Sequence, residues 1–212
     1  MTLIIGISGK IGTGKSTVSF LLRQGGAVQA WRDFGDEVKQ EVSQLFQFDL
    51  DLCYSEEGKD TTIIHPDLPG GAMPIRRILQ WWGTDVRRAQ DPMYWVKRLN
   101  EWLVANSPDS LVIGDVRFQS EAKFIRSFGG SLFRIHPYWG WKSKPEIARH
   151  VSETDLDAWA DWDQELSPQY GLPYLEEVAQ DIIHRVLPPS ERPYELNLPE
   201  WGSLESLDQQ EG

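Results

Sequence analysis

Short apolar runs alternate with stretches of helical periodicity along most of this chain. The first run, Leu3-Ile4-Ile5-Gly6-Ile7, is continuous, as expected for a strand that is buried on both faces. A glycine-rich segment then leads into a helical pattern at about 15–24, which ends near Gly25-Gly26. Strands that alternate with helices in this way are typical of α/β proteins with a parallel sheet.

The same alternation continues for most of the sequence. We expect later strands at about 27–32, 111–115 and 131–136, and a short fifth strand within 157–171, where apolar residues are sparse. Further helices are expected to run from the turn at 33–36 to about Phe46, from Pro74 until Gly83-Thr84 interrupts or ends the pattern, and over about 91–105, 119–128 and 173–187. The pattern therefore predicts a three-layer α/β fold, with a mostly parallel five-stranded sheet and helices on both faces.

Three segments lack a sustained period. Residues 47–73 are predicted to be either a loop that covers a substrate site or a surface insertion. Residues 137–154 combine aromatic and basic side chains and could form a lid over phosphates or an ordinary surface connection. Residues 188–212 are acidic and contain prolines, which indicates an unstructured or surface-draped tail after a domain spanning 1–187.

Composition adds limits on the class of protein. The 212 residues, 40% hydrophobic and 25% charged, suit one soluble α/β domain. No apolar run could span a bilayer, no signal peptide is visible, and the single cysteine, Cys53, excludes an internal disulfide, so we expect a cytoplasmic protein. A net charge of −11 argues against a general nucleic-acid or membrane-surface binder.

Basic residues nevertheless gather between positions 76 and 98. This cluster indicates a pocket for a small phosphate ester, although for its last four members a solvated helix face is the favoured interpretation. Its members are Arg76, Arg77, Arg87, Arg88, Lys97 and Arg98.

The strongest chemical signal is Gly9-Lys10-Ile11-Gly12-Thr13-Gly14-Lys15-Ser16, which follows the first strand and opens the first helix. It matches the phosphate-binding loop G-x-x-x-x-G-K-[ST] at every fixed position. Its glycines let backbone N–H groups turn toward an anion, Lys15 can reach the β- and γ-phosphates, and the Ser16 hydroxyl can ligate Mg²⁺. We therefore expect a nucleoside triphosphate on Gly12, Thr13, Gly14, Lys15, Ser16 and Thr17.

A second candidate site follows the strand at 111–115. Asp115 ends this strand and Arg117 follows it, and ligands collect at the carboxyl ends of strands in open parallel sheets. Both side chains should therefore lie beside the loop, with Asp115 positioning Mg²⁺ through water. Lys15, Asp115 and Arg117 are the predicted catalytic residues.

Several blocks resemble the signature of tailed-phage deoxynucleoside monophosphate kinases. They are Arg76-Arg77-Ile78-Leu79-Gln80-Trp81-Trp82-Gly83-Thr84-Asp85, Met93-Tyr94-Trp95-Val96-Lys97, Asp115-Val116-Arg117 and His150-Val151-Ser152-Glu153. With the loop and Phe34-Gly35-Asp36-Glu37-Val38-Lys39, the similarity runs in order over about residues 1–155. The central block is specific, whereas the C-terminal third matches little. Some members have Asp where this chain has Ser16.

The resemblance implies transfer of phosphate from ATP to a deoxynucleoside monophosphate (dNMP), giving ADP and dNDP. It implies an acceptor-binding helical region at about 47–106, a lid at 137–154 that contains Arg149, His150 and Glu153, and possible homodimers. The acceptor would be lined by Lys39, Arg76, Arg77, Gln80, Gly83, Thr84, Trp95 and Arg117.

Alternatives stay open for single residues and for the function. A core position is the alternative for Trp95, a solvated helix charge for Lys39, and a hinge or structural role for His150. A kinase for another small acceptor, similar to dephospho-coenzyme A kinase, and a switch module that binds ATP without transferring its phosphate are the alternative functions.

Overall fold

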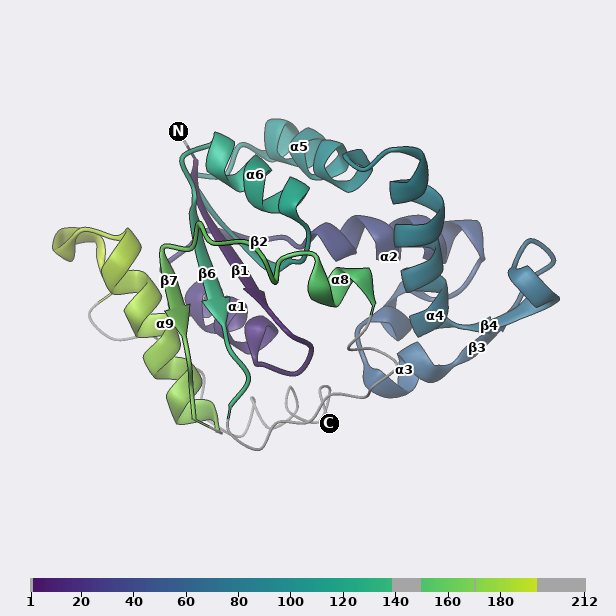
Figure 1. The fold of residues 1–212 in the computed structure, drawn as a ribbon, viewed down its shortest axis with the longest axis horizontal. Helices are drawn as coiled ribbons and strands as arrows, with labels where there is room; N and C mark the ends of the chain where they lie inside the picture. The colour runs from purple at the N-terminus through teal and green to yellow at the C-terminus, as the bar shows by residue number, and fades with distance from the viewer. Residues whose placement is uncertain (1, 139–149, 170, 194–212) are drawn as a thin grey trace. The chain divides into compact units, whose positions relative to one another are not determined.

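Five parallel strands form one sheet in the computed structural model, which describes residues 2–138, 150–169 and 171–193 (Figure 1). Their order across the sheet is β2-β5-β1-β6-β7, so the first strand lies at the centre. The strands are β1 (Leu3–Gly9), β2 (Ala30–Trp31), β5 (Ser110–Val116), β6 (Ser131–Ile135) and β7 (Gln164–Leu166). The predicted five-stranded α/β sheet is confirmed, and all its pairings are parallel.

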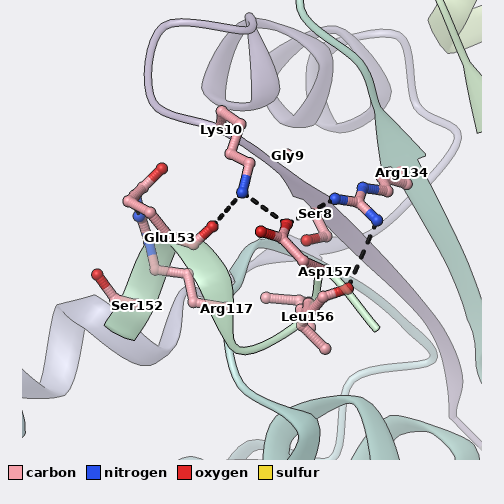
Figure 2. A pocket seen from close by; sticks show the side chains of 10 residues that line it. Ser8, Gly9, Lys10, Arg117, Arg134, Ser152, Glu153, Leu156 and Asp157 are labelled. Atoms are coloured by element: carbon pink, nitrogen blue, oxygen red, sulfur yellow. Dashed lines mark hydrogen bonds and ion pairs between the residues drawn. The ribbon is translucent and has the colours of Figure 1, made fainter. Parts of the chain in front are cut away.

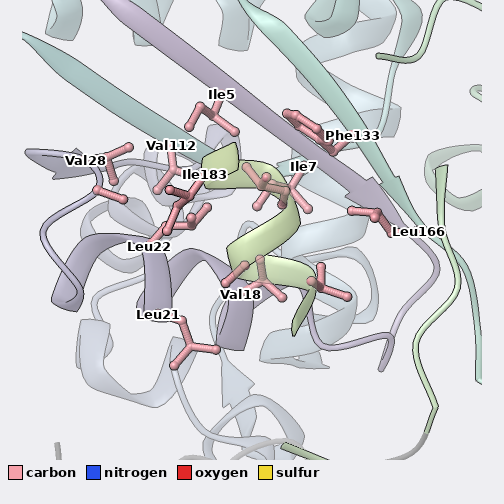
Figure 3. Packing of buried hydrophobic residues seen from close by; sticks show 14 of the residues in the cluster. Ile5, Ile7, Val18, Leu21, Leu22, Val28, Val112, Phe133, Leu166 and Ile183 are labelled. Carbon is pink, nitrogen blue, oxygen red and sulfur yellow. The ribbon is translucent and has the colours of Figure 1, made fainter. Parts of the chain in front are cut away.

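The sheet belongs to the first of two compact units, which contains the described residues up to 33 and those from 102 to 193. On one face of the sheet lie α1 (Lys15–Gln24) and α9 (Leu172–Val186), whose Leu22 and Ile183 pack against Ile5 of β1 (Figure 3). On the other face lies α6 (Gln119–Ser127). A Cβ atom at Gly6 would stand 2.6 Å from Cδ1 of Ile125, so glycine lets α6 approach β1 closely. The predicted three layers are present.

The two shortest strands depart from the expected lengths for identifiable reasons. The strand expected at 27–32 is reduced to Ala30–Trp31, because the amides of Ala27 and Val28 donate to the carbonyl of Leu22 at the end of α1. The fifth strand, β7, has only three residues. Asp163, just before it, accepts at Oδ2 from the amide of Leu132 at 2.7 Å and donates its own amide to the carbonyl of Leu132. Polar contacts therefore fix the register of this edge strand.

Arg126 of α6 completes this attachment. Its guanidinium donates to Asp163 at 2.7 Å, to Asp161 at 2.9 Å and to the carbonyl of Gly130 at 3.0 Å. One side chain thus ties α6 to the segment that precedes β7.

Replacing Arg126 by alanine should lower the free energy of unfolding by about 1–3 kcal/mol, because it leaves Asp163 without its cation. Urea denaturation monitored by circular dichroism measures this loss. Lys97→Ala is the control: its ion pair with Asp91 is exposed, so the loss of stability should be smaller. An equal loss in both variants would contradict the role of Arg126.

The second unit comprises residues 34–101. Its elements are α2 (Phe34–Leu45), η1 (Leu50–Cys53), α3 (Glu56–Asp60), β3 (Thr62–Ile64), η2 (Pro69–Gly71), β4 (Ala72–Pro74), α4 (Ile75–Gln80), the π-helix η3 (Trp81–Arg88) and the start of α5 (Tyr94–Asn106). Val42, Phe46, Leu68 and Ile78 form its core, with Trp81 and Trp82 packed against it.

One prediction about this unit was wrong. Residues 47–73 are not a loop: they hold η1, α3, η2 and most of the antiparallel hairpin of β3 and β4. Side-chain caps start the first two elements: Asp49 accepts from the amide of Asp51 at η1, and Ser55 accepts from the amide of Gly58 at α3. Elements of three to five residues are too short to show a period. The helical pattern from Pro74 was expected to be interrupted or to end at Gly83-Thr84: α4 gives way to π geometry at Trp81, and the helix continues through Arg88.

The remaining described elements are α8 (Val151–Thr154) and η4 (Pro189–Glu191). Most of the expected lid, including Arg149, and most of the acidic tail lie outside the described residues. Among the described helices, none combines the length and the apolar character needed to cross a bilayer.

Candidate active site

The predicted phosphate-binding loop connects β1 to α1. Gly12 and Gly14 have φ angles of 73° and 81°, in the left-handed region that favours glycine. A Cβ atom at Gly14 would also stand 2.6 Å from Cδ1 of Leu175 in α9. The loop therefore needs glycine at this position both for its backbone angle and for the close approach of α9.

Lys15 begins α1 and is only 7% exposed. Its Nζ donates to the carbonyl of Lys10 at 2.8 Å, and Thr13 Oγ1 donates to the same carbonyl at 2.9 Å. The ammonium group is thus folded back against its own loop. Ser16 is exposed and Thr17 is half-buried in the first turn of α1, where helix N–H groups have no partner within the helix.

Three cations come together beside the loop, at the carboxyl ends of adjacent strands (Figure 2). Lys10 follows β1, Arg117 follows β5 and Arg134 lies near the end of β6. Each is paired with an acidic residue of segment 150–157, which contains α8. Asp157 Oδ1 accepts from Lys10 at 2.6 Å and from Arg134 at 3.0 Å.

Glu153 makes the central contacts of this cluster. Its carboxylate, 3% exposed, accepts at Oε2 from the amide of Ile11 at 3.1 Å and forms an ion pair through Oε1 with Nη1 of Arg117. Its carbonyl accepts from the ammonium of Lys10. One anion thus already bridges a backbone N–H of the loop and a guanidinium, the two kinds of donor that bind phosphate oxygens.

Arg117 is also held through its backbone. Glu121 Oε2 accepts from the amides of Arg117 and Phe118 at 2.7 and 3.0 Å, which fixes the turn between β5 and α6. Asp115 is half-buried near the end of β5. Before it, the amide of Gly114 donates to Asp33 Oδ1 at 2.6 Å. The structure therefore places Arg117 beside the loop and Asp115 at the same edge of the sheet.

His150 caps α8: its Nδ1 accepts from the amide of Ser152 at 3.2 Å and contacts Ser152 Oγ at 2.8 Å. This arrangement matches the structural alternative considered for His150. Among the described residues, no three His, Cys, Asp or Glu side chains are grouped so that they could hold a metal ion by themselves.

In the second unit, the two expected acceptor arginines differ. Arg76 binds Glu56 at 2.5 Å and Asp60 at 3.1 Å, both in α3. Although burial opposes ionisation, hydrogen bonds from Lys59 and Arg76 lower the pKa of Glu56 below its usual value. Arg76 is therefore already paired within its own unit, whereas Arg77 has no hydrogen bond or ion pair to any residue that the structure describes.

Other expected acceptor residues lie in the same unit. Lys39 binds Asp36 at 3.2 Å, and its Nζ lies 4.3 Å from the ring centroid of Tyr54. Gln80 ends α4, and Gly83 and Thr84 belong to η3. Trp95 is only 1% exposed, and its indole N–H donates to the carbonyl of Gly83 at 2.9 Å. Its ring is surrounded by protein, so as placed here it supports Gly83 and offers no face on which a base could stack.

Sequence reasoning missed Lys10, Arg134 and Asp157. Arg134 could have been found, because the rule that pointed to Arg117 applies equally to the end of β6. Lys10 occupies a variable position of the loop motif, so the motif gives it no weight. Asp157 lies in a stretch with sparse apolar residues, and only the fold brings it to Lys10.

Comparison with known proteins gives one family. Residues 67–161 match the sequence model of the deoxynucleotide monophosphate kinases. The chain is also 30% identical, over 174 residues, to a protein of Acanthamoeba polyphaga mimivirus provisionally named a deoxynucleotide monophosphate kinase; the match covers 73% of this chain and 82% of that protein.

Two solved structures that resemble this chain are named as kinases. A shikimate kinase from Aquifex aeolicus vf5 has a TM-score of 0.47 and 16% identity, covering 86% of this chain and 95% of its own. A sugar kinase from Janibacter sp. HTCC2649 has a TM-score of 0.37 and 13% identity, covering 87% and 92%.

Proposed function

Because this chain belongs to the deoxynucleotide monophosphate kinase family, we propose that it transfers the γ-phosphoryl group of ATP to a dNMP, giving ADP and a dNDP. The observation that carries the proposal is the bridge made by Glu153 between the phosphate-binding loop and Arg117. An anion can contact the loop and this guanidinium at the same time, as a phosphoryl group in transfer must.

The proposed phosphoryl transfer requires no covalent bond between the protein and a substrate. An oxygen of the acceptor monophosphate attacks the γ-phosphorus, the bond from that phosphorus to the β–γ bridging oxygen breaks, and ADP leaves with the electron pair. Catalysis then consists of aligning the reactants and stabilising the spread negative charge.

Each group has a task in this scheme. Backbone N–H groups of Gly12 to Thr17 and the ammonium of Lys15 hold the triphosphate. Arg117 stabilises charge on the phosphoryl group, because its planar fork binds two oxygens and stays protonated. Arg77 and Gln80, in the second unit, recognise the dNMP through its phosphate and an edge of its base.

We further propose that ATP arrives as its Mg²⁺ complex. The Ser16 hydroxyl is exposed directly after Lys15, and Asp115 lies at the same edge of the sheet. Hydroxyl and carboxylate oxygens are hard donors that suit Mg²⁺, with Asp115 acting through bound water. The ion would neutralise charge on the β- and γ-phosphates.

Release of ADP from ATP–Mg²⁺ in a coupled assay tests the proposed reaction. At least one of the common dNMPs should accelerate this release by about tenfold or more over slow hydrolysis. Ribonucleoside monophosphates and dephospho-coenzyme A, tested in parallel, separate this activity from other small-molecule kinases. If none of the dNMPs accelerates ADP release, the proposal is wrong.

A further inference from the structure

The helix that carries Arg77 and Gln80 changes its geometry at its middle. α4 continues without a break into η3, a π-helix in which backbone N–H groups bond to carbonyls five residues back. The amide of Ala89, which follows η3, still donates to the carbonyl of Thr84. Long π segments are rare and their geometry is less favourable than that of an α-helix, so specific contacts must hold this one in place.

One of these contacts is the bond from Trp95 to Gly83. The buried indole of α5 donates to the Gly83 carbonyl at 2.9 Å and gives this carbonyl a partner outside the helix. A Cβ atom at Gly83 would stand 3.3 Å from Cγ1 of Val38 in α2, so the helix backbone also lies close to α2 here.

A stronger set of contacts is centred on Glu41 of α2. Its Oε1 accepts from Trp82 Nε1 at 3.0 Å and from Arg87 Nε at 2.6 Å, and its Oε2 accepts from the Tyr94 hydroxyl at 3.0 Å. The Arg87 guanidinium also lies 4.9 Å from the ring centroid of Trp82 and 4.8 Å from that of Tyr94. We call Glu41, Trp82, Arg87 and Tyr94 the Glu41 cluster.

Trp82 and Arg87 are five residues apart, and this spacing distinguishes an α-helix from a π-helix. In an α-helix of 3.6 residues per turn, five residues make about 1.4 turns, so the two side chains would point roughly 140° apart. In a π-helix the residue five positions along lies nearly above the first, as its hydrogen bonds require. A single carboxylate oxygen that holds both side chains therefore favours the π geometry.

The geometry of η3 in turn determines the direction in which the side chains of α4 point. If residues 81–88 returned to α geometry, the half containing α4 would rotate by about one residue, or roughly 100°, relative to the half anchored by the cluster. Arg77 and Gln80 lie on the rotating half. Their direction therefore depends on a carboxylate that touches neither of them.

We propose that Glu41 is a positioning residue: by selecting the π geometry of η3, it directs Arg77 and Gln80 toward the dNMP. The identity of this ligand rests on the proposed function. Glu41 itself contacts only side chains of its own unit among the residues described.

The test compares Glu41→Ala with Glu41→Gln. Glu41→Ala should raise the KM for the dNMP by about tenfold or more, while the Kd for ATP, measured by calorimetry, changes by less than about twofold. Glu41→Gln should raise this KM by less than about threefold, because its amide oxygen still accepts from Trp82 and Arg87. A crystal structure of Glu41→Ala should show residues 81–88 closed by bonds between residues four apart.

Two further variants guard against a purely structural effect. Arg126→Ala destabilises the first unit and should leave the KM for the dNMP unchanged. Trp82→Phe keeps a ring beneath Arg87 but loses its hydrogen bond to Glu41, and should raise this KM even if Glu41→Ala does not fold. An unchanged KM in Trp82→Phe, or in a folded Glu41→Ala, overturns the proposal.

Different results would disprove the role of Glu41 and the proposed function. A π-helix that persists in the crystal structure of Glu41→Ala overturns the role of Glu41, whatever the activity. Absence of dNMP-dependent turnover in the unchanged protein instead overturns the proposed function, and with it the acceptor assigned to Arg77 and Gln80.

Discussion

Replacing Arg117 by alanine should lower the kcat of dNMP-dependent ADP formation by about 10³-fold, the scale at which a charge-stabilising arginine contributes to phosphoryl transfer. The guanidinium already pairs with a buried carboxylate beside the loop, so its position is set before any substrate binds. Its turn is fixed independently by Glu121, which accepts from the amides of Arg117 and Phe118. The substitution should therefore remove charge and leave the backbone in place.

Steady-state kinetics with saturating ATP–Mg²⁺ measure this loss. Arg117→Lys keeps the charge but not the planar fork, and should fall between alanine and the unchanged protein. Glu153→Gln is the matched variant on the other side of the ion pair, and its kcat should fall by less than about tenfold because the guanidinium stays in place. A kcat for Arg117→Ala within about threefold of the unchanged value would contradict the role of Arg117.

The centre of the sheet could be predicted from sequence, but its edges could not be defined as closely. β1 and β5 are buried on both faces, so each appears as a continuous apolar run. β7 is instead fixed by Asp163 and Arg126, a pair 37 residues apart in the chain. β2 is short because Ala27 and Val28 bond to the end of α1, a contact that no local pattern encodes.

Some features of the candidate site could likewise be predicted from the sequence, and others could not. Lys15 and its loop could be predicted because the spacing of the motif defines the shape of the loop. Arg117 could be predicted because ligands collect at the carboxyl ends of parallel strands. The Glu41 cluster could not be predicted, because Glu41 and Tyr94 are 53 residues apart and meet only through the packing of α2 and α5. The π geometry that this cluster stabilises was invisible for the same reason: its apolar residues fit an α-helical period as well.

Replacing Lys15 by methionine should lower kcat/KM for ATP by about 10²–10³-fold, comparable to the loss of one preorganised donor to a developing anion. The side chain is nine-tenths buried and its ammonium is directed back to the Lys10 carbonyl, so it contributes charge at a fixed place in the loop. Methionine preserves most of the stem's volume and removes only the donor, so the loop should keep its conformation and its thermal stability.

Lys10→Met is the matched control, since it removes a second ammonium from the same loop. Lys10 binds Asp157 and the carbonyl of Glu153, both part of the protein. Its loss should therefore lower kcat/KM by less than about tenfold while Lys15→Met lowers it far more. Equal losses in the two variants would mean that general positive charge near the loop, and not the contact of Lys15 with the triphosphate, accounts for the activity.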